Sequence, residues 1–122
     1  MSELPHHPLY IDGRWADGAD GERFTVVEPA TGQPLATVAA AGVGDVDRAV
    51  RAARAAFDRG PWPHTPPAER ARILHAIADA LEERTAELAE LEARDCGATL
   101  RKTTFLDIPL GIEHLRTFAE LA

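Results

Sequence analysis

The sequence has few of the residues that indicate a disulfide framework, a membrane segment or a secretory signal. Cys96 is the only cysteine, so no internal disulfide can form and a reducing compartment is expected. The longest apolar stretch, residues 36–43, is too short to span a bilayer. No basic segment followed by an apolar one opens the chain, so the cytoplasm is the expected location.

Basic side chains are also scarce compared with acidic ones. The chain has 13 Lys and Arg residues against 20 Asp and Glu residues, which gives a formal charge of −7. A nucleic-acid-binding protein needs a basic face to neutralise phosphates. We therefore expect neither nucleic acid nor a membrane as a partner. Lys102 is the only lysine, so chemistry that depends on a lysine has one candidate.

The first third of the sequence is typical of short antiparallel strands. Asp12-Gly13 lies between β-forming residues, and this pair favours a two-residue hairpin turn because both turn positions need a positive φ. Residues 23–27 and 34–39 are also rich in β-forming residues, and the turn residues Pro29 to Gly32 separate them. The pattern predicts two β-hairpins, or a small antiparallel ribbon, within residues 9–39.

After residue 42 the apolar residues follow a helical period. One face of a first helix is predicted from Val46, Val50, Ala53 and Phe57, and Gly60-Pro61 ends that helix. A second helix is predicted from Pro67 to about Asp95, and Gly97 is its expected stop. Its apolar stripe consists of Leu74, Ile77, Leu81, Leu88 and Leu91.

A third helix is predicted from Leu100 to the end of the chain, with Pro109 expected to kink or split it. The fold class is therefore α/β (α+β within this segment), with N-terminal hairpins followed by three amphipathic helices. Residues 1–8 are expected to be a flexible tail, and residues 9–122 an incomplete domain. The last helix has no stop signal, which favours a piece of a longer protein; a terminal helix docked on a small core is the alternative.

No assembled active site is predicted from the residues alone. Cys96 follows the predicted end of a helix, where the helix dipole disfavours a thiolate, so a structural cysteine is expected rather than a small Cys/His enzyme. His114 is expected on a helix surface, and His6-His7 in a flexible tail offers only weak metal binding. No phosphate-binding glycine loop and no His-Glu-x-x-His motif is present.

Several segments, in order along the chain, resemble the N-terminal region of aldehyde dehydrogenases. They are Tyr10-Ile11-Asp12-Gly13-Arg14-Trp15, Pro29-Ala30-Thr31-Gly32, Asp45-Val46-Asp47-Arg48-Ala49-Val50, Gly60-Pro61-Trp62, Pro67-Ala68-Glu69-Arg70 and Asp95-Cys96-Gly97. The likeness extends from Leu9 onward, and its shared order and spacing make it specific. It implies that residues 9–122 belong to the Rossmann-like cofactor domain of such an enzyme.

The resemblance also implies a function for the full-length parent. Family members oxidise aldehydes to carboxylic acids with NAD or NADP, using a cysteine thiolate that lies downstream in the family. Cys96 matches a threonine of the family pattern, so it is not the expected nucleophile. The resemblance therefore implies a small aldehyde substrate and a homo-oligomeric parent, and an isolated chain without activity.

One family site falls within the sequence. Many members bind a structural monovalent cation, potassium or sodium, and the matching ligands here are the carbonyls of Val26 and Val27 and the carboxylate of Asp95. From the residues alone, Asp95 is more simply a helix-end residue. A second hypothesis for the whole chain is a truncated, non-catalytic relative that acts as a binding or assembly module through exposed apolar helix faces.

Overall fold

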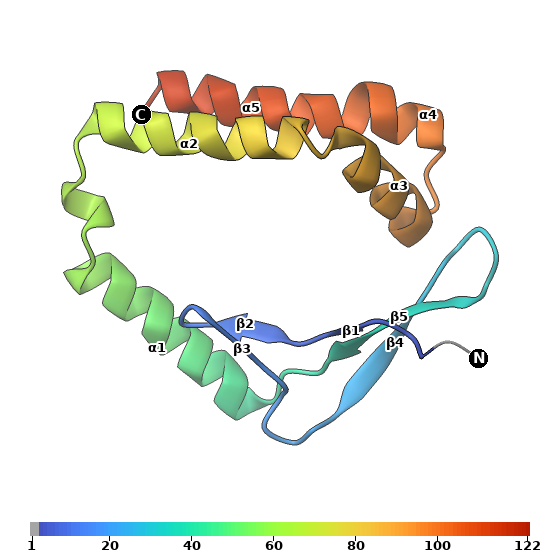
Figure 1. Ribbon diagram of the computed structural model, residues 1–122. Helices are drawn as coiled ribbons and strands as arrows, with labels where there is room; N and C mark the ends of the chain where they lie inside the picture. Colours follow the sequence, from blue (N-terminus) through green and yellow to red (C-terminus); the bar gives the residue numbers. More distant parts are fainter. Residues whose placement is uncertain (1–2) are drawn as a thin grey trace. The chain divides into compact units, whose positions relative to one another are not determined.

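The computed structural model describes residues 3–122, which form two compact units divided after Pro63 (Figure 1). The first unit contains β1 (His6–His7), β2 (Leu9–Ile11), β3 (Arg14–Ala16), β4 (Arg23–Val27), β5 (Pro34–Ala39) and α1 (Val43–Arg59). A 3-10 turn over Trp62–His64 follows α1. The second unit contains α2 (Pro67–Glu82), α3 (Thr85–Cys96), α4 (Leu100–Lys102), a π-helical turn (Thr103–Asp107) and α5 (Ile108–Glu120).

Strands β2 and β3 form the first predicted hairpin. They pair antiparallel, with Leu9 opposite Ala16 and Ile11 opposite Arg14. The turn between them has φ values of 52° at Asp12 and 74° at Gly13, which explains the Asp-Gly pair. The structure therefore confirms this hairpin.

Strands β4 and β5 form the second predicted hairpin, and β1 adds to it as a parallel neighbour of β5. His6 lies opposite Thr37, and the Thr37 N–H donates to the Pro5 carbonyl at 2.9 Å. The flexible tail expected over residues 1–8 is therefore wrong for residues 5–7, because sheet hydrogen bonds hold them. Met1 and Ser2 lie outside the described residues.

Helix α1 uses a different face from the predicted one. The predicted apolar stripe is exposed, since Val46, Val50 and Phe57 keep 51%, 62% and 64% of their surface. The partly buried residues are the alanines at 49, 52 and 55, and α1 lies against β2 on that side. Small side chains let a helix approach a hairpin closely, so alanine rather than valine decides which face is covered.

The second predicted helix is in fact two helices, α2 and α3, separated at Glu83 and Arg84. Arg84 leaves the helical conformation, with φ −107° and ψ 14°. The Thr85 hydroxyl donates to the Glu82 carbonyl at 2.8 Å, which satisfies an acceptor at the end of α2. The continuous helix to Asp95 is therefore wrong. The stop at Gly97 is confirmed, because this residue caps α3 with φ 73°.

Pro109 interrupts the third predicted helix, as expected. A π-helical turn precedes it, in which the Ile108 N–H donates to the Thr103 carbonyl five residues back. Proline has no N–H to donate to the carbonyl of Phe105, and the wider turn accommodates that loss. Short α4 and longer α5 therefore lie on either side of the π turn.

Helices α2 and α5 lie side by side in the second unit (Figure 1). Arg116 of α5 reaches Asp79 at 2.9 Å and Glu82 at 2.7 Å on α2. His75 lies 3.3 Å from Glu120. Rising numbers on α2 meet falling numbers on α5, so the two helices are antiparallel.

Few side chains of the described residues are fully buried, and most of these are small. The buried apolar residues are Ala36, Ala39, Ala78, Ala89, Ile112 and Ala119. Large apolar residues such as Phe105 and Phe118 are exposed. Over residues 3–122, no helix has the length and apolar character needed to cross a membrane. The α/β class, with hairpins preceding helices, is confirmed, and the expected number of helices is corrected.

Candidate functional site

The three predicted cation ligands lie on β4 and near the end of α3. Val26 and Val27 are on β4, an outer strand with a register irregularity between these two residues. Val27 lies opposite Pro34, whose backbone has no N–H to donate to the Val27 carbonyl. Asp95 is exposed in the last turn of α3, where the helix dipole favours a cation. Val26 and Val27 are in the first unit and Asp95 is in the second, so the site stays a prediction.

The other candidate residues from the sequence do not form a catalytic cluster. Cys96 is an exposed free thiol at the last position of α3, and His114 is exposed on α5. Across residues 3–122, no group of three or more His, Cys, Asp or Glu side chains is placed to hold a metal ion. These residues therefore show no arrangement for nucleophilic or metal-assisted chemistry.

A polar cluster that sequence reasoning missed surrounds His6. Its Nε2 lies 2.6 Å from an Asp17 carboxylate oxygen, and its Nδ1 lies 3.0 Å from the Thr37 hydroxyl. Arg23 donates to the other Asp17 oxygen at 3.0 Å. The His6 hydrogen bond, assisted by Arg23, holds the pKa of Asp17 below its ordinary value. The hydrogen-bond partners are 6 to 31 residues apart along the chain, so no local sequence pattern predicted this cluster.

Asp45 is the one acidic side chain buried completely within the described residues. Its carboxylate accepts the Ala19 N–H and the Gly42 N–H, each at 3.0 Å, and Arg48 lies 2.7 Å away. The N–H groups of Ala19 and Gly42, with the Arg48 guanidinium, hold the pKa of Asp45 below its ordinary value. Asp45 lies three residues after the N-cap residue Gly42, and this local spacing could have predicted the Gly42–Asp45 hydrogen bond.

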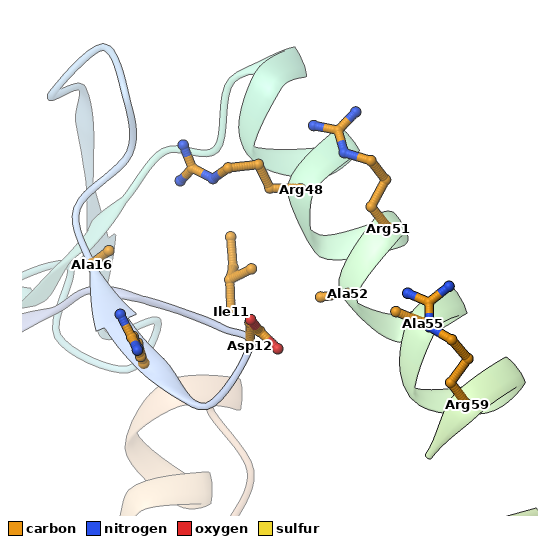
Figure 2. Close-up of a pocket in the computed structure, with 9 residues that line it drawn as sticks. Ile11, Asp12, Ala16, Arg48, Arg51, Ala52, Ala55 and Arg59 are labelled. Carbon is orange, nitrogen blue, oxygen red and sulfur yellow. The ribbon is translucent and has the colours of Figure 1, made fainter.

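A groove of about 530 Å³ lies within the first unit, between α1 and the β2–β3 hairpin (Figure 2). Four arginines line it, with Asp12 as the only acidic residue: Arg14 from the hairpin, and Arg48, Arg51 and Arg59 from α1. Arg48 contacts buried Asp45, whereas Arg51 is 4.0 Å from Asp47 and highly exposed. This groove is therefore basic although the chain as a whole is acidic. Sequence reasoning missed it because the hairpin and the helix meet only in three dimensions.

The sequence is similar to that of known proteins over nearly its whole length. The model of the "Aldehyde dehydrogenase family" matches residues 15–122. Aldehyde dehydrogenase family 2 member C4 of Arabidopsis thaliana is 40% identical over 95% of this chain and 23% of its own length. Aminoacetaldehyde dehydrogenase of Pseudomonas aeruginosa is 44% identical over 98% of this chain and 24% of its own length.

The backbone of this chain is also similar to solved structures of aldehyde dehydrogenases. The NAD⁺ complex of an aldehyde dehydrogenase from Bacillus cereus matches 94% of this chain with a TM-score of 0.90 and 38% identity, and the match spans 23% of that structure. The NAD-dependent enzyme from Sinorhizobium meliloti matches 97% of this chain with the same TM-score of 0.90, at 32% identity and over 24% of its own chain. The chain thus spans about a quarter of the length of the relatives that it matches. Sequence and backbone both show that it belongs to the aldehyde dehydrogenase family.

Proposed function

We propose that this chain supplies the N-terminal scaffold of an NAD(P)-dependent enzyme that oxidises a small aldehyde to a carboxylic acid. The observation that supports this most strongly is the continuous backbone match to an aldehyde dehydrogenase in complex with NAD⁺. The β-hairpins and helices lie in the family order and extend over nearly the whole chain. Sequencing the coding DNA beyond the Ala122 codon tests this proposal. An in-frame continuation with a glycine-rich loop and a downstream cysteine supports it, and an immediate stop codon contradicts it.

Residues 3–122 do not form a cradle for NAD(P). The strand-to-helix turn from β5 into α1 is where a dinucleotide phosphate would sit on a helix N-terminus. Here the buried Asp45 carboxylate already accepts the Gly42 N–H at that position. A phosphate would meet this negative charge instead of free N–H groups. The described residues therefore do not fit the cofactor, and the proposal assigns its binding to other parts of the parent protein.

We propose further that the isolated chain is catalytically inactive. Its only thiol, Cys96, is exposed at the C-terminal end of α3, and within residues 3–122 no group forms a hydrogen bond with its sulfur. A catalytic cysteine needs an adjacent base or a positive environment that stabilises the thiolate. Absorbance at 340 nm, with acetaldehyde and either NAD⁺ or NADP⁺, should show no reduction for the chain or for Cys96→Ala. Turnover that disappears in Cys96→Ala would overturn this proposal.

A structural monovalent cation is the third part of the proposal. The carbonyls of Val26 and Val27 with the Asp95 carboxylate form an all-oxygen set, which potassium and sodium prefer. Thermal melting in potassium, sodium or choline chloride at equal ionic strength tests this set. We expect a potassium- or sodium-specific rise in Tm that Asp95→Asn removes. Glu113→Gln, which neutralises an exposed carboxylate on α5, should keep the rise. Equal melting in all three salts contradicts the cation site.

An assembly module is the second candidate function, and the exposed apolar side chains favour it. Val50 and Phe57 on α1 are 62% and 64% exposed, and Phe105 in the π turn is 77% exposed. Large exposed apolar surfaces mark sites of protein association. Light scattering of the purified chain separates the two candidates. A monodisperse folded species favours the module, and aggregation favours a scaffold that needs the rest of its parent.

A further inference from the structure

The basic groove between α1 and the β2–β3 hairpin contains two arginines that nothing in the first unit neutralises. Within residues 3–122, the arginine side chains with neither an ion pair nor a hydrogen bond are Arg14, Arg59 and Arg101. Arg14 and Arg59 line the groove, whereas Arg101 lies on α4 in the second unit. Unpaired guanidinium groups are therefore concentrated where the surface is hollowed.

The groove offers these arginines no internal partner. Asp12 is the only acidic lining residue, and it forms an ion pair with neither Arg14 nor Arg59. Arg48 forms an ion pair with buried Asp45 at 2.7 Å, so its guanidinium group already has a partner. Figure 2 shows Arg48 and Arg59 on α1, across the groove from the hairpin residue Ile11. The groove therefore has a positive charge that an oxyanion could neutralise.

Between the arginines, the groove is lined by apolar and mostly short side chains. Ile11 and Ala16 line it on the hairpin side, and Ala52 and Ala55 line it on α1. Short side chains leave space above the helix backbone for a small hydrocarbon body. A ligand that combines such a body with negative groups would bury apolar surface and pair the guanidinium groups together.

We propose that this groove binds a small organic molecule with two oxyanionic groups, phosphate or carboxylate, held by Arg14 and Arg59. The planar guanidinium fork donates two parallel hydrogen bonds to either kind of oxyanion. The site lies in the first unit alone, and it does not depend on the dehydrogenase activity proposed above.

Isothermal titration calorimetry of the full chain at low ionic strength tests this site, because dilute salt leaves charge interactions almost unscreened. Propane-1,3-diol bisphosphate is the phosphate probe and glutarate is the carboxylate probe, and saturable binding of either one supports the proposal. Arg14→Gln and Arg59→Gln should each weaken binding about tenfold, because each removes a charged hydrogen-bond donor. Circular dichroism of each variant establishes that the fold is kept.

Arg101→Gln is the matched control, because it removes the same charge from a residue that is also unpaired but lies outside the groove. It should bind both probes with the affinity of the unchanged chain. An equal loss of affinity in Arg101→Gln would show attraction by net charge and overturn the site. Absence of binding by both probes, or unchanged affinity in Arg14→Gln and Arg59→Gln, would overturn it as well.

Discussion

The Thr103 hydroxyl holds α3 against the π turn, and replacing it with a methyl group should destabilise the second unit. Thr103 is completely buried, and its hydroxyl lies 2.8 Å from the Ala89 carbonyl of α3 and 3.1 Å from the Leu100 carbonyl. Thr103→Val keeps the shape of the side chain but loses a hydrogen bond with a net value of about 0.5–1.5 kcal/mol. The new methyl group also sits too close to the Ala89 carbonyl, since a carbon–oxygen contact needs about 3.3 Å or more.

The displacement that this crowding forces adds about 1 kcal/mol, so we expect a total loss near 2 kcal/mol for Thr103→Val. Thr103→Ser is the matched control, because it keeps the hydroxyl and loses one buried methyl group at a cost of about 1 kcal/mol.

Urea unfolding followed by circular dichroism at 222 nm measures both variants through the helices. With a slope of about 2 kcal/mol per molar urea, the midpoint should fall by about 1 M for valine and about 0.5 M for serine. If Thr103→Val unfolds at the same urea concentration as Thr103→Ser, or at a higher one, the hydroxyl does not tether α3 and the reasoning fails.

Three further outcomes test the first unit. Gly18→Ala should prevent the native fold, since a Cβ there would overlap the Ala40 carbonyl. The Cβ of Gly44→Ala meets no atom, so this variant should stabilise α1 by about 0.5–1 kcal/mol. Thermal melting compares the two variants, and equal Tm values would refute the clash at Gly18. The free energy of unfolding should fall as the solution is acidified below pH 4. Asp17 and Asp45 have pKa values below their ordinary 3.8 in the folded state, so the unfolded chain takes up protons first, and a flat urea midpoint from pH 5 to pH 3 would contradict this. Asp45→Asn should lower the midpoint at neutral pH and weaken this acid dependence, and an unchanged pH profile would show that Asp45 is not its source.

The sequence predicted the elements whose signals are local. The Asp12-Gly13 turn, the stop at Gly97 and the interruption at Pro109 each follow from backbone conformations that one or two residues impose. The match to the aldehyde dehydrogenase family was also visible, because it depends on the order of several short segments.

The sequence did not predict features that depend on contacts between distant segments. The division between α2 and α3 follows a turn at Arg84, where no glycine or proline announces a break. The covered face of α1 was misassigned because periodicity ranks residues by hydrophobicity, and a hairpin packs more closely on alanine than on valine. The strand at His6 was missed for a similar reason, since its partner Thr37 lies 31 residues away.

The candidate sites also differ in how far the sequence could predict them. The cation ligands Val26, Val27 and Asp95 were predicted through the family resemblance, and they stay a prediction; they lie on the outer strand β4 and at the end of α3. The basic groove needed the structure, because Arg14 and Arg59 belong to elements that are separate in the sequence. Whether an arginine has an ion-pair partner depends on its neighbours in space, and the sequence alone does not give those neighbours.

The buried carboxylate of Asp45 has a consequence for how the first unit opens. It joins the turn at Ala19 to the residue that precedes α1, and these segments are 23 positions apart in the chain. The Ala19 and Gly42 amide protons share this one acceptor, so a movement that withdraws the Asp45 carboxylate exposes both amides at once. Native-state hydrogen exchange should therefore give both amides the same opening free energy. The β-rich part and the start of α1 would then open together, as one cooperative step.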